Sequence, residues 1–153
     1  MSDAPPIRRL EHWTLVSTDI EKTKRFYVDV LGAKLPAGRP PGGPASVDLA
    51  GTLIDFFPAS NDWAPSPGSG GQHHAYIIDL ESFDQWVEHF KAKGVPARLT
   101  THGFNRMSIY VDDPDGYHIE LTVVLPDRET ARREIEKRGL DVSWFQMTGS
   151  GQA

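Results

Sequence analysis

The chain has 153 residues, of which 39% are hydrophobic and 24% are charged, and this composition is typical of an ordinary globular protein. It contains no cysteine, which excludes a disulfide framework, a cysteine-based zinc site, an iron–sulfur cluster and a cysteine nucleophile. The formal net charge of -5 argues against nucleic-acid binding, because that function needs clustered Lys and Arg. Six histidines and 21 acidic residues remain as groups that could carry chemistry.

The N-terminal residues carry neither the basic segment nor the apolar run of a signal peptide, and no apolar stretch of membrane-spanning length occurs in the sequence. We therefore expect a cytoplasmic protein without a membrane partner. The length suits a single domain over residues 1–153, and a chain of this size can bury a sizeable core without a structural metal. Any metal is therefore expected to be functional.

The first half of the chain begins with a strand-like run over residues 12–17. Thr18, followed three residues later by Glu21, is typical of a helix N-terminus, and Gly32 predicts where that helix stops. Strands are expected after the helix, weakly at 33–35 and more clearly at 45–49 and 52–57.

The second half repeats this order after a Ser/Pro/Gly-rich stretch at 60–71. A strand-like run begins at His73, Ser82 with Gln85 predicts a second helix cap, and Gly94 predicts the end of that helix. Strands are expected at 97–101, 107–111 and 117–124. The charged segment 127–138 has few apolar residues, so we expect a solvated terminal helix that adds nothing to the core.

The repeat and three local sequences resemble the vicinal oxygen chelate superfamily, which includes glyoxalase I, fosfomycin- and bleomycin-resistance proteins and extradiol dioxygenases. The three sequences are residues 12–15, 26–32 and 113–121. The resemblance implies an α+β fold of two βαβββ modules, at 7–59 and 72–125, that form a half-open barrel around a metal site, with 126–153 as a helical tail. It also implies that His12, His73 and Glu120 are the metal ligands.

Two imidazoles and one carboxylate leave coordination positions open, and this ligand set is typical of non-haem Fe(II). Mn(II) or another divalent metal also fits. Strand alternation puts Glu120 and His118 on one face of the last strand, where a cation would offset the cost of burying a carboxylate. His118 could line the cavity or hydrogen-bond to a neighbouring strand. His74 competes with His73 as a ligand, but alternation directs it to the opposite face.

The spacing of His102, Tyr110 and Glu120 resembles that of type I extradiol dioxygenases. The resemblance implies that His102 and Tyr110 are catalytic, Tyr110 by hydrogen-bonding a bound catechol, and that Glu120 binds iron. We therefore expect an Fe(II)-dependent extradiol ring-cleavage dioxygenase that acts on a catechol-type aromatic substrate with O2, as a homodimer. One departure is the segment 58–63, which lacks a histidine that larger members of this class usually carry.

Two alternative functions stay open at this stage. A metal-dependent isomerase or transferase of the glyoxalase or fosfomycin-resistance type favours a second carboxylate or a cationic pocket, and Asp55 is the sole acid in the matching segment 52–57. A metal-free protein that sequesters an aromatic ligand would use stacking surfaces such as Trp13, Trp63 and Tyr76. Metal content distinguishes the enzyme from the sequestering protein.

Overall fold

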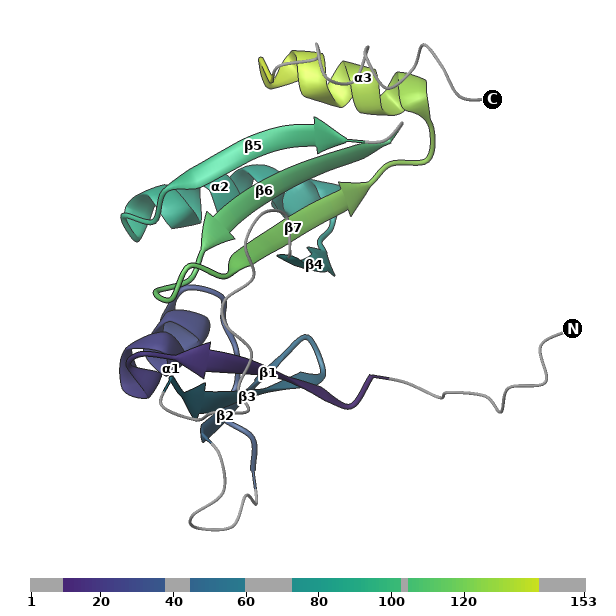
Figure 1. Cartoon of the computed structure of the whole chain (residues 1–153). Helices are drawn as coiled ribbons and strands as arrows, with labels where there is room; N and C mark the ends of the chain where they lie inside the picture. The colour runs from purple at the N-terminus through teal and green to yellow at the C-terminus, as the bar shows by residue number, and fades with distance from the viewer. Residues whose placement is uncertain (1–9, 38–44, 60–72, 103–104, 141–153) are drawn as a thin grey trace, which may run out of the picture. The chain divides into compact units, whose positions relative to one another are not determined.

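The computed structural model describes residues 10–37, 45–59, 73–102 and 105–140. The chain divides into two compact units, residues 1–67 and 68–153, and each is described here by itself. Both units contain a small mixed sheet and at least one helix, which confirms the predicted α+β fold class (Figure 1). None of the described helices is long and apolar enough to cross a membrane. That residues 1–153 form a single domain stays a prediction.

The first unit is a three-stranded sheet with one helix. β1 (His12–Ser17) pairs in parallel with β3 (Thr52–Pro58), and β3 pairs antiparallel with β2 (Ala45–Leu49), in the order β1-β3-β2. Helix α1 (Ile20–Asp29) contacts β2 and β3. The apolar sides of the helix and sheet form the core of the unit, whose largest fully buried side chains are Tyr27, Val47, Ile54 and Phe56.

Two local predictions for the first unit need correction. The cap of α1 is Asp19 and not Thr18, because the Asp19 carboxylate accepts a hydrogen bond of 3.0 Å from the backbone N–H of Lys22. A carboxylate at this position also interacts favourably with the helix dipole. The strand predicted at 33–35 is a single bridge between Lys34 and Asp48. Gly32 has a φ of +73°, as expected of a glycine that ends a helix.

The second unit is a four-stranded sheet in the order β4-β7-β6-β5. β4 (His73–Ile77) pairs in parallel with β7 (His118–Val124), while β7, β6 (Arg106–Asp112) and β5 (Ala97–His102) pair antiparallel. Helix α2 (Phe83–Ala92) lies behind this sheet in Figure 1. The strands alternate, so that one face of the sheet contributes a buried apolar layer: Met107, Ile109, Val111, Ile119, Leu121 and Val123.

The second helix does not start as the Ser82–Gln85 pattern predicts. A single 3-10 turn, η1 (Leu80–Ser82), precedes α2, and Ser82 makes no side-chain capping bond. Its hydroxyl instead donates to the backbone carbonyl of Asp79 at 2.8 Å. The Ser82 hydroxyl is therefore bonded within the preceding turn and does not cap α2.

The terminal helix α3 (Arg128–Lys137) contacts β6 and contributes to the core. Ala131 and Ile135 are fully buried, which corrects the prediction of a solvated helix. Two apolar residues four positions apart are enough to give an otherwise charged helix one buried side. Just beyond the helix, Arg138 pairs with Asp84 of α2. Helix α3 thus packs against the rest of its unit.

Candidate functional site

One side of the second sheet carries most of the candidate residues. Because β4, β7, β6 and β5 are adjacent, residues in register form rows across the strands. One row consists of His73, His118 and Asp112. The next row consists of Ala75, Glu120, Tyr110 and Arg98. We call the side of the sheet that bears these two rows the polar face. Strand pairing thereby brings together residues that lie far apart in the sequence.

Glu120 is the centre of this arrangement. Its side chain is 2% exposed, and its Oε2 atom lies 2.9 Å from Nε2 of His73. Its Oε1 atom accepts a hydrogen bond of 2.6 Å from the Ser108 hydroxyl. The carboxylate is therefore buried with hydrogen-bonding partners, as a buried acid must be. His73 and Glu120 present an imidazole nitrogen and a carboxylate oxygen at one point, and this donor set suits a divalent metal ion.

Tyr110 lies beside Glu120 in the neighbouring strand. Burial raises the pKa of Tyr110 to about 12, helped by the charge of Glu120 and the hydrogen bond to it, while Arg98 opposes the shift. The phenol is therefore protonated at neutral pH and donates to the Glu120 carboxylate. The guanidinium of Arg98 lies 5.0 Å from the centre of the Tyr110 ring, within cation–π distance.

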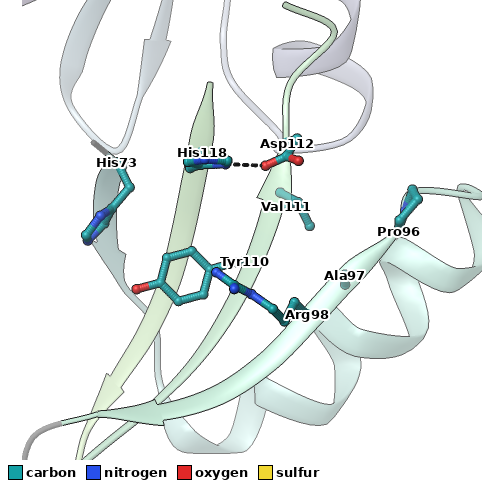
Figure 2. A pocket seen from close by; sticks show the side chains of 8 residues that line it. All are labelled: His73, Pro96, Ala97, Arg98, Tyr110, Val111, Asp112 and His118. Atoms are coloured by element: carbon teal, nitrogen blue, oxygen red, sulfur yellow. Dashed lines mark hydrogen bonds and ion pairs between the residues drawn. The ribbon is translucent and has the colours of Figure 1, made fainter. Parts of the chain in front are cut away.

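A pocket of about 680 Å³ opens on this face. It is lined by His73, Pro96, Ala97, Arg98, Tyr110, Val111, Asp112 and His118. Figure 2 shows Tyr110 between His73 and Arg98, with its hydroxyl directed toward the His73 side. The pocket thus combines an imidazole that can bind a metal (His73), a phenol (Tyr110) and a guanidinium (Arg98).

Arg98 lies in the predicted strand 97–101, but no pattern in the sequence marked it as a site residue. The register Arg98–Tyr110 puts it on the polar face, and a single sequence does not reveal that register. An arginine paired across a hairpin with a predicted site tyrosine is the signal that could have found it. Arg98 supplies the cationic pocket that the isomerase or transferase alternative needs.

His118 fulfils both roles that the sequence left open. It lines the pocket, and its Nδ1 atom lies 2.5 Å from the Asp112 carboxylate on the neighbouring strand. His74 alternates to the opposite face of β4, away from His73. Burial, and secondarily the nearby His73, lowers the pKa of His74 below its usual value. His74 is therefore neutral at pH 7.

The other predicted site residues lie elsewhere in the described structure. His12 begins β1 of the first unit, where its Nδ1 contacts the Glu11 carboxylate. Among the described residues no group of three or more His, Asp or Glu side chains could hold a metal, so the predicted set of three ligands stays a prediction. His102 ends β5 with its backbone paired to Arg106, and its side chain lies outside the described residues.

Tyr76 and Trp13, two of the three aromatic residues predicted for a sequestering protein, do not lie on the polar face. Tyr76 is in register with Leu121, which belongs to the apolar side of the second sheet. Trp13 is in register with the fully buried Ile54 of the first unit. Trp63 lies outside the described residues. Neither Tyr76 nor Trp13 lines the pocket.

The first unit has a carboxylate in the position that Glu120 occupies in the second. His12 is in register with Leu53, and Asp55 follows Leu53 by two residues. In the same way, His73 is in register with His118, and Glu120 follows His118 by two residues. Asp55 is buried and accepts a hydrogen bond of 2.5 Å from the Ser46 hydroxyl. The repeat therefore extends to a buried, serine-bonded acid in each unit.

Proteins similar to the chain include two transferases and a fosfomycin resistance protein. The chain is 32% identical over 130 residues to the metallothiol transferase FosB of Staphylococcus epidermidis, covering 80% of this chain and 87% of the relative. It is 27% identical over 135 residues to the glutathione transferase FosA of Serratia marcescens, covering 88% and 94%. The solved structure of the fosfomycin resistance protein FosX from Listeria monocytogenes matches with a TM-score of 0.65 at 25% identity, covering 83% and 99%.

These relatives overturn the predicted extradiol dioxygenase activity and the catechol and O2 substrates that accompany it. They do not support the preference for Fe(II) either. The physical reason lies in the spacing that suggested the activity. Tyr110 and Glu120 are directly paired in a hairpin whose turn is 113–116, and His102 pairs with Arg106 in the hairpin before it. The spacing therefore follows from the strand pairing of the fold. Enzymes with this fold can share that pairing and still catalyse different reactions.

A family model covers most of the described chain. The model of the glyoxalase/bleomycin resistance protein/dioxygenase superfamily matches residues 9–121, a segment that runs from before β1 into β7. The predicted superfamily is therefore confirmed, while the predicted dioxygenase subgroup is not. The chain belongs to the glyoxalase/bleomycin resistance protein/dioxygenase superfamily.

Proposed function

We propose that the protein is a divalent-metal-dependent transferase that joins a thiol to a small anionic electrophile, such as fosfomycin. One observation carries this proposal: His73, paired with the buried Glu120, and Arg98 line the same pocket. The names of the relatives, a metallothiol transferase and a glutathione transferase, support it. Formation of a homodimer stays a separate prediction.

The metal would be held by His73 and Glu120, with His12 as the third ligand implied by the family resemblance. The donor chemistry fits, because an imidazole nitrogen and a buried carboxylate oxygen lie 2.9 Å apart in the second unit. Ligands of this type accept Mn(II), Fe(II) and other divalent ions, so we propose a divalent metal and not specifically iron. A bound ion of this kind acts as a Lewis acid on a substrate oxygen.

Arg98 is the residue that we propose for recognition of an anionic group. A guanidinium forms paired hydrogen bonds with phosphonate or carboxylate oxygens, and it keeps its charge at any physiological pH. The Tyr110 ring beneath the guanidinium restricts where that group can lie. Fosfomycin carries both a phosphonate and an epoxide, so it offers an anion for Arg98 and a reactive carbon elsewhere in the pocket.

The proposed reaction opens the epoxide. The thiol sulfur forms a bond to an epoxide carbon, the carbon–oxygen bond breaks, and the epoxide oxygen receives the proton that the thiol loses. The product therefore has the summed mass of fosfomycin and the thiol. Tyr110, as a protonated phenol, donates its proton to Glu120 in a hydrogen bond and so helps to hold that carboxylate in place beside the pocket.

The test incubates the Mn(II)-loaded protein with fosfomycin and either glutathione or cysteine, and detects the adduct by mass spectrometry. We expect an adduct from the native protein and none from Glu120→Gln. Arg98→Gln should lower kcat/KM for fosfomycin by about 10–100-fold, because a charge-assisted hydrogen bond is worth about 1.5–3 kcal/mol. Arg106→Gln is the matched control, since Arg106 is exposed and does not line the pocket.

Three outcomes would contradict the proposal or a part of it. A metal-loaded protein that yields no adduct with either thiol is not the proposed transferase. Binding of fosfomycin without any turnover would favour sequestration. Equal losses in Arg98→Gln and Arg106→Gln would show that Arg98 has no special role in recognising the anion.

A further inference from the structure

Ser108 is a buried serine whose hydroxyl contacts Glu120 from the neighbouring strand. Its side chain is fully buried on β6, in register with Thr122 of β7. The Ser108 Oγ atom lies 2.6 Å from Oε1 of Glu120 and 3.0 Å from Oγ1 of Thr122. A serine hydroxyl has a single proton, and the shorter contact to a charged oxygen takes it. Ser108 is thus a committed donor to one oxygen of Glu120.

The two oxygens of Glu120 consequently have different surroundings. Oε1 accepts the hydrogen bond from Ser108, while Oε2 lies 2.9 Å from Nε2 of His73, and Tyr110 also donates to the carboxylate. We propose that Ser108 is a positioning residue for metal binding: by holding Oε1, it makes Oε2 the oxygen that Glu120 offers to the metal beside His73. This inference rests on the metal site of the proposed function. It adds a residue that none of the sequence patterns indicated.

The Ser46–Asp55 pair of the first unit allows a role in metal binding to be distinguished from a purely structural role of Ser108. Ser46 donates to the buried Asp55 at 2.5 Å, so it also links a buried hydroxyl to a buried carboxylate between adjacent strands. The Ser46–Asp55 pair includes none of the proposed metal ligands. Removing either hydroxyl should affect folding similarly, whereas removing the Ser108 hydroxyl alone should affect metal binding.

Two effects on the metal follow from loss of the Ser108 hydroxyl. Hydrogen-bond partners that orient a metal ligand typically contribute 10–100-fold to metal affinity. Without the Ser108 hydrogen bond, Oε1 could also reach the metal, which would change the coordination from one carboxylate oxygen to two. A change in coordination number alters the visible absorption spectrum of bound Co(II). Affinity and spectrum therefore report on Ser108 independently of catalytic activity.

The experiment measures Mn(II) affinity by calorimetry and the Co(II) spectrum for the full chain and its variants. We expect Ser108→Ala to weaken Mn(II) binding by about 10–100-fold and to change the Co(II) spectrum. Ser46→Ala, the matched control, should change the Mn(II) dissociation constant less than about threefold and leave the spectrum unchanged. Equal behaviour of the two variants would overturn the proposed role of Ser108.

A second pair of variants covers the case in which Ser108→Ala does not fold. Ser108→Thr and Ser108→Val have side chains of the same shape, but only threonine keeps the hydroxyl. We expect tighter Mn(II) binding by Ser108→Thr than by Ser108→Val, by about tenfold or more. Equal affinities would contradict the inference. If the native protein binds neither Mn(II) nor Co(II), or if Glu120→Gln binds them equally well, the metal site of the proposed function fails instead.

Discussion

The two units use the same strand pairing to position different groups. In the first unit, the buried Asp55 pairs with Thr14, two residues after His12. In the second, the buried Glu120 pairs with Ala75, two residues after His73. Glu120 is one methylene longer and lies 2.9 Å from His73. His12 contacts its sequence neighbour Glu11. The same strand register therefore gives different sites in the two units. The longer side chain of Glu120 reaches His73, whereas His12 contacts Glu11.

The largest expected effect concerns the two histidines. His73→Ala should weaken Mn(II) binding by more than about 100-fold, because loss of a ligand costs more than loss of a residue that orients one. If His12 is the third ligand, His12→Ala should weaken Mn(II) binding to a similar extent. Calorimetric titration with Mn(II) measures both dissociation constants.

His89→Ala is the control for this pair, since His89 lies on α2 and does not line the pocket. A His12→Ala protein with native affinity would limit the site to the second unit and would remove the predicted third ligand. Native affinity in His73→Ala would contradict the proposed metal site itself.

The buried acid of the first unit should matter for stability and not for metal. Asp55→Ala leaves the Ser46 hydroxyl buried without its acceptor, so the free energy of unfolding should fall by about 1–3 kcal/mol. The Mn(II) dissociation constant should change less than about twofold. Urea denaturation and calorimetry measure the two quantities. A large loss of Mn(II) affinity would instead place Asp55 among the ligands.

The double variant Ser46→Ala/Asp55→Ala sharpens this prediction. If the two side chains stabilise the unit chiefly through their mutual hydrogen bond, the double variant should lose less free energy of unfolding than the sum of the two single losses. Strict additivity would show that the Ser46–Asp55 bond contributes little.

The terminal helix distinguishes the described part of the second unit from that of the first. Arg138 pairs with Asp84 and Glu134, and its guanidinium lies 5.6 Å from the centre of the Phe83 ring. Arg138→Met should lower the free energy of unfolding at pH 7 by about 1–2 kcal/mol, with the exposed Asp84 contributing little of it. Arg132→Met is the control, because Arg132 is exposed and its ion pair with Glu136 lies on the surface of α3.

The loss in Arg138→Met should depend on pH. The hydrogen bond from Arg138 lowers the pKa of Glu134 below its usual value of 4.5, although burial opposes this shift. A lowered pKa in the folded state stabilises the fold above the pKa of the unfolded chain, and that contribution disappears as the pH falls through the folded value. Urea denaturation from pH 7 to pH 3 should therefore show a difference between native and variant that shrinks below about pH 4.5. A constant difference would assign the effect to packing on Phe83.

The sequence allowed most of the fold to be predicted, because hydrophobic period and turn residues act locally. The runs 12–17 and 45–49 match β1 and β2, and Gly32 and Gly94 adopt the positive φ expected at helix ends. The errors occurred where two local solutions compete. Adjacent residues Thr18 and Asp19 can both cap a helix, and the structure uses the second.

The site was harder to predict, because it depends on which residues face one another across strands. His73 and Glu120 followed from the repeat and the resemblance, and they do meet. Arg98 and Ser108 have no recognisable motif, and only the register of β5, β6 and β7 shows that they flank Tyr110 and Glu120. The reaction was predicted wrongly because its supposed signature was a consequence of the same register.

The smallest expected effect compares how the two units begin their helices. Asp19→Ala should lower the free energy of unfolding by about 1 kcal/mol, because it removes the side-chain acceptor for the Lys22 N–H. Ser82→Ala should lower it by less than half as much, since Ser82 makes no capping bond to α2 and its contact with Asp79 is exposed. Asp19→Asn is the matched control, because asparagine is as good a cap as aspartate but lacks the charge. If Asp19→Asn and Asp19→Ala are equally destabilised in urea, the charge at the helix N-terminus, and not the capping bond, is what stabilises α1.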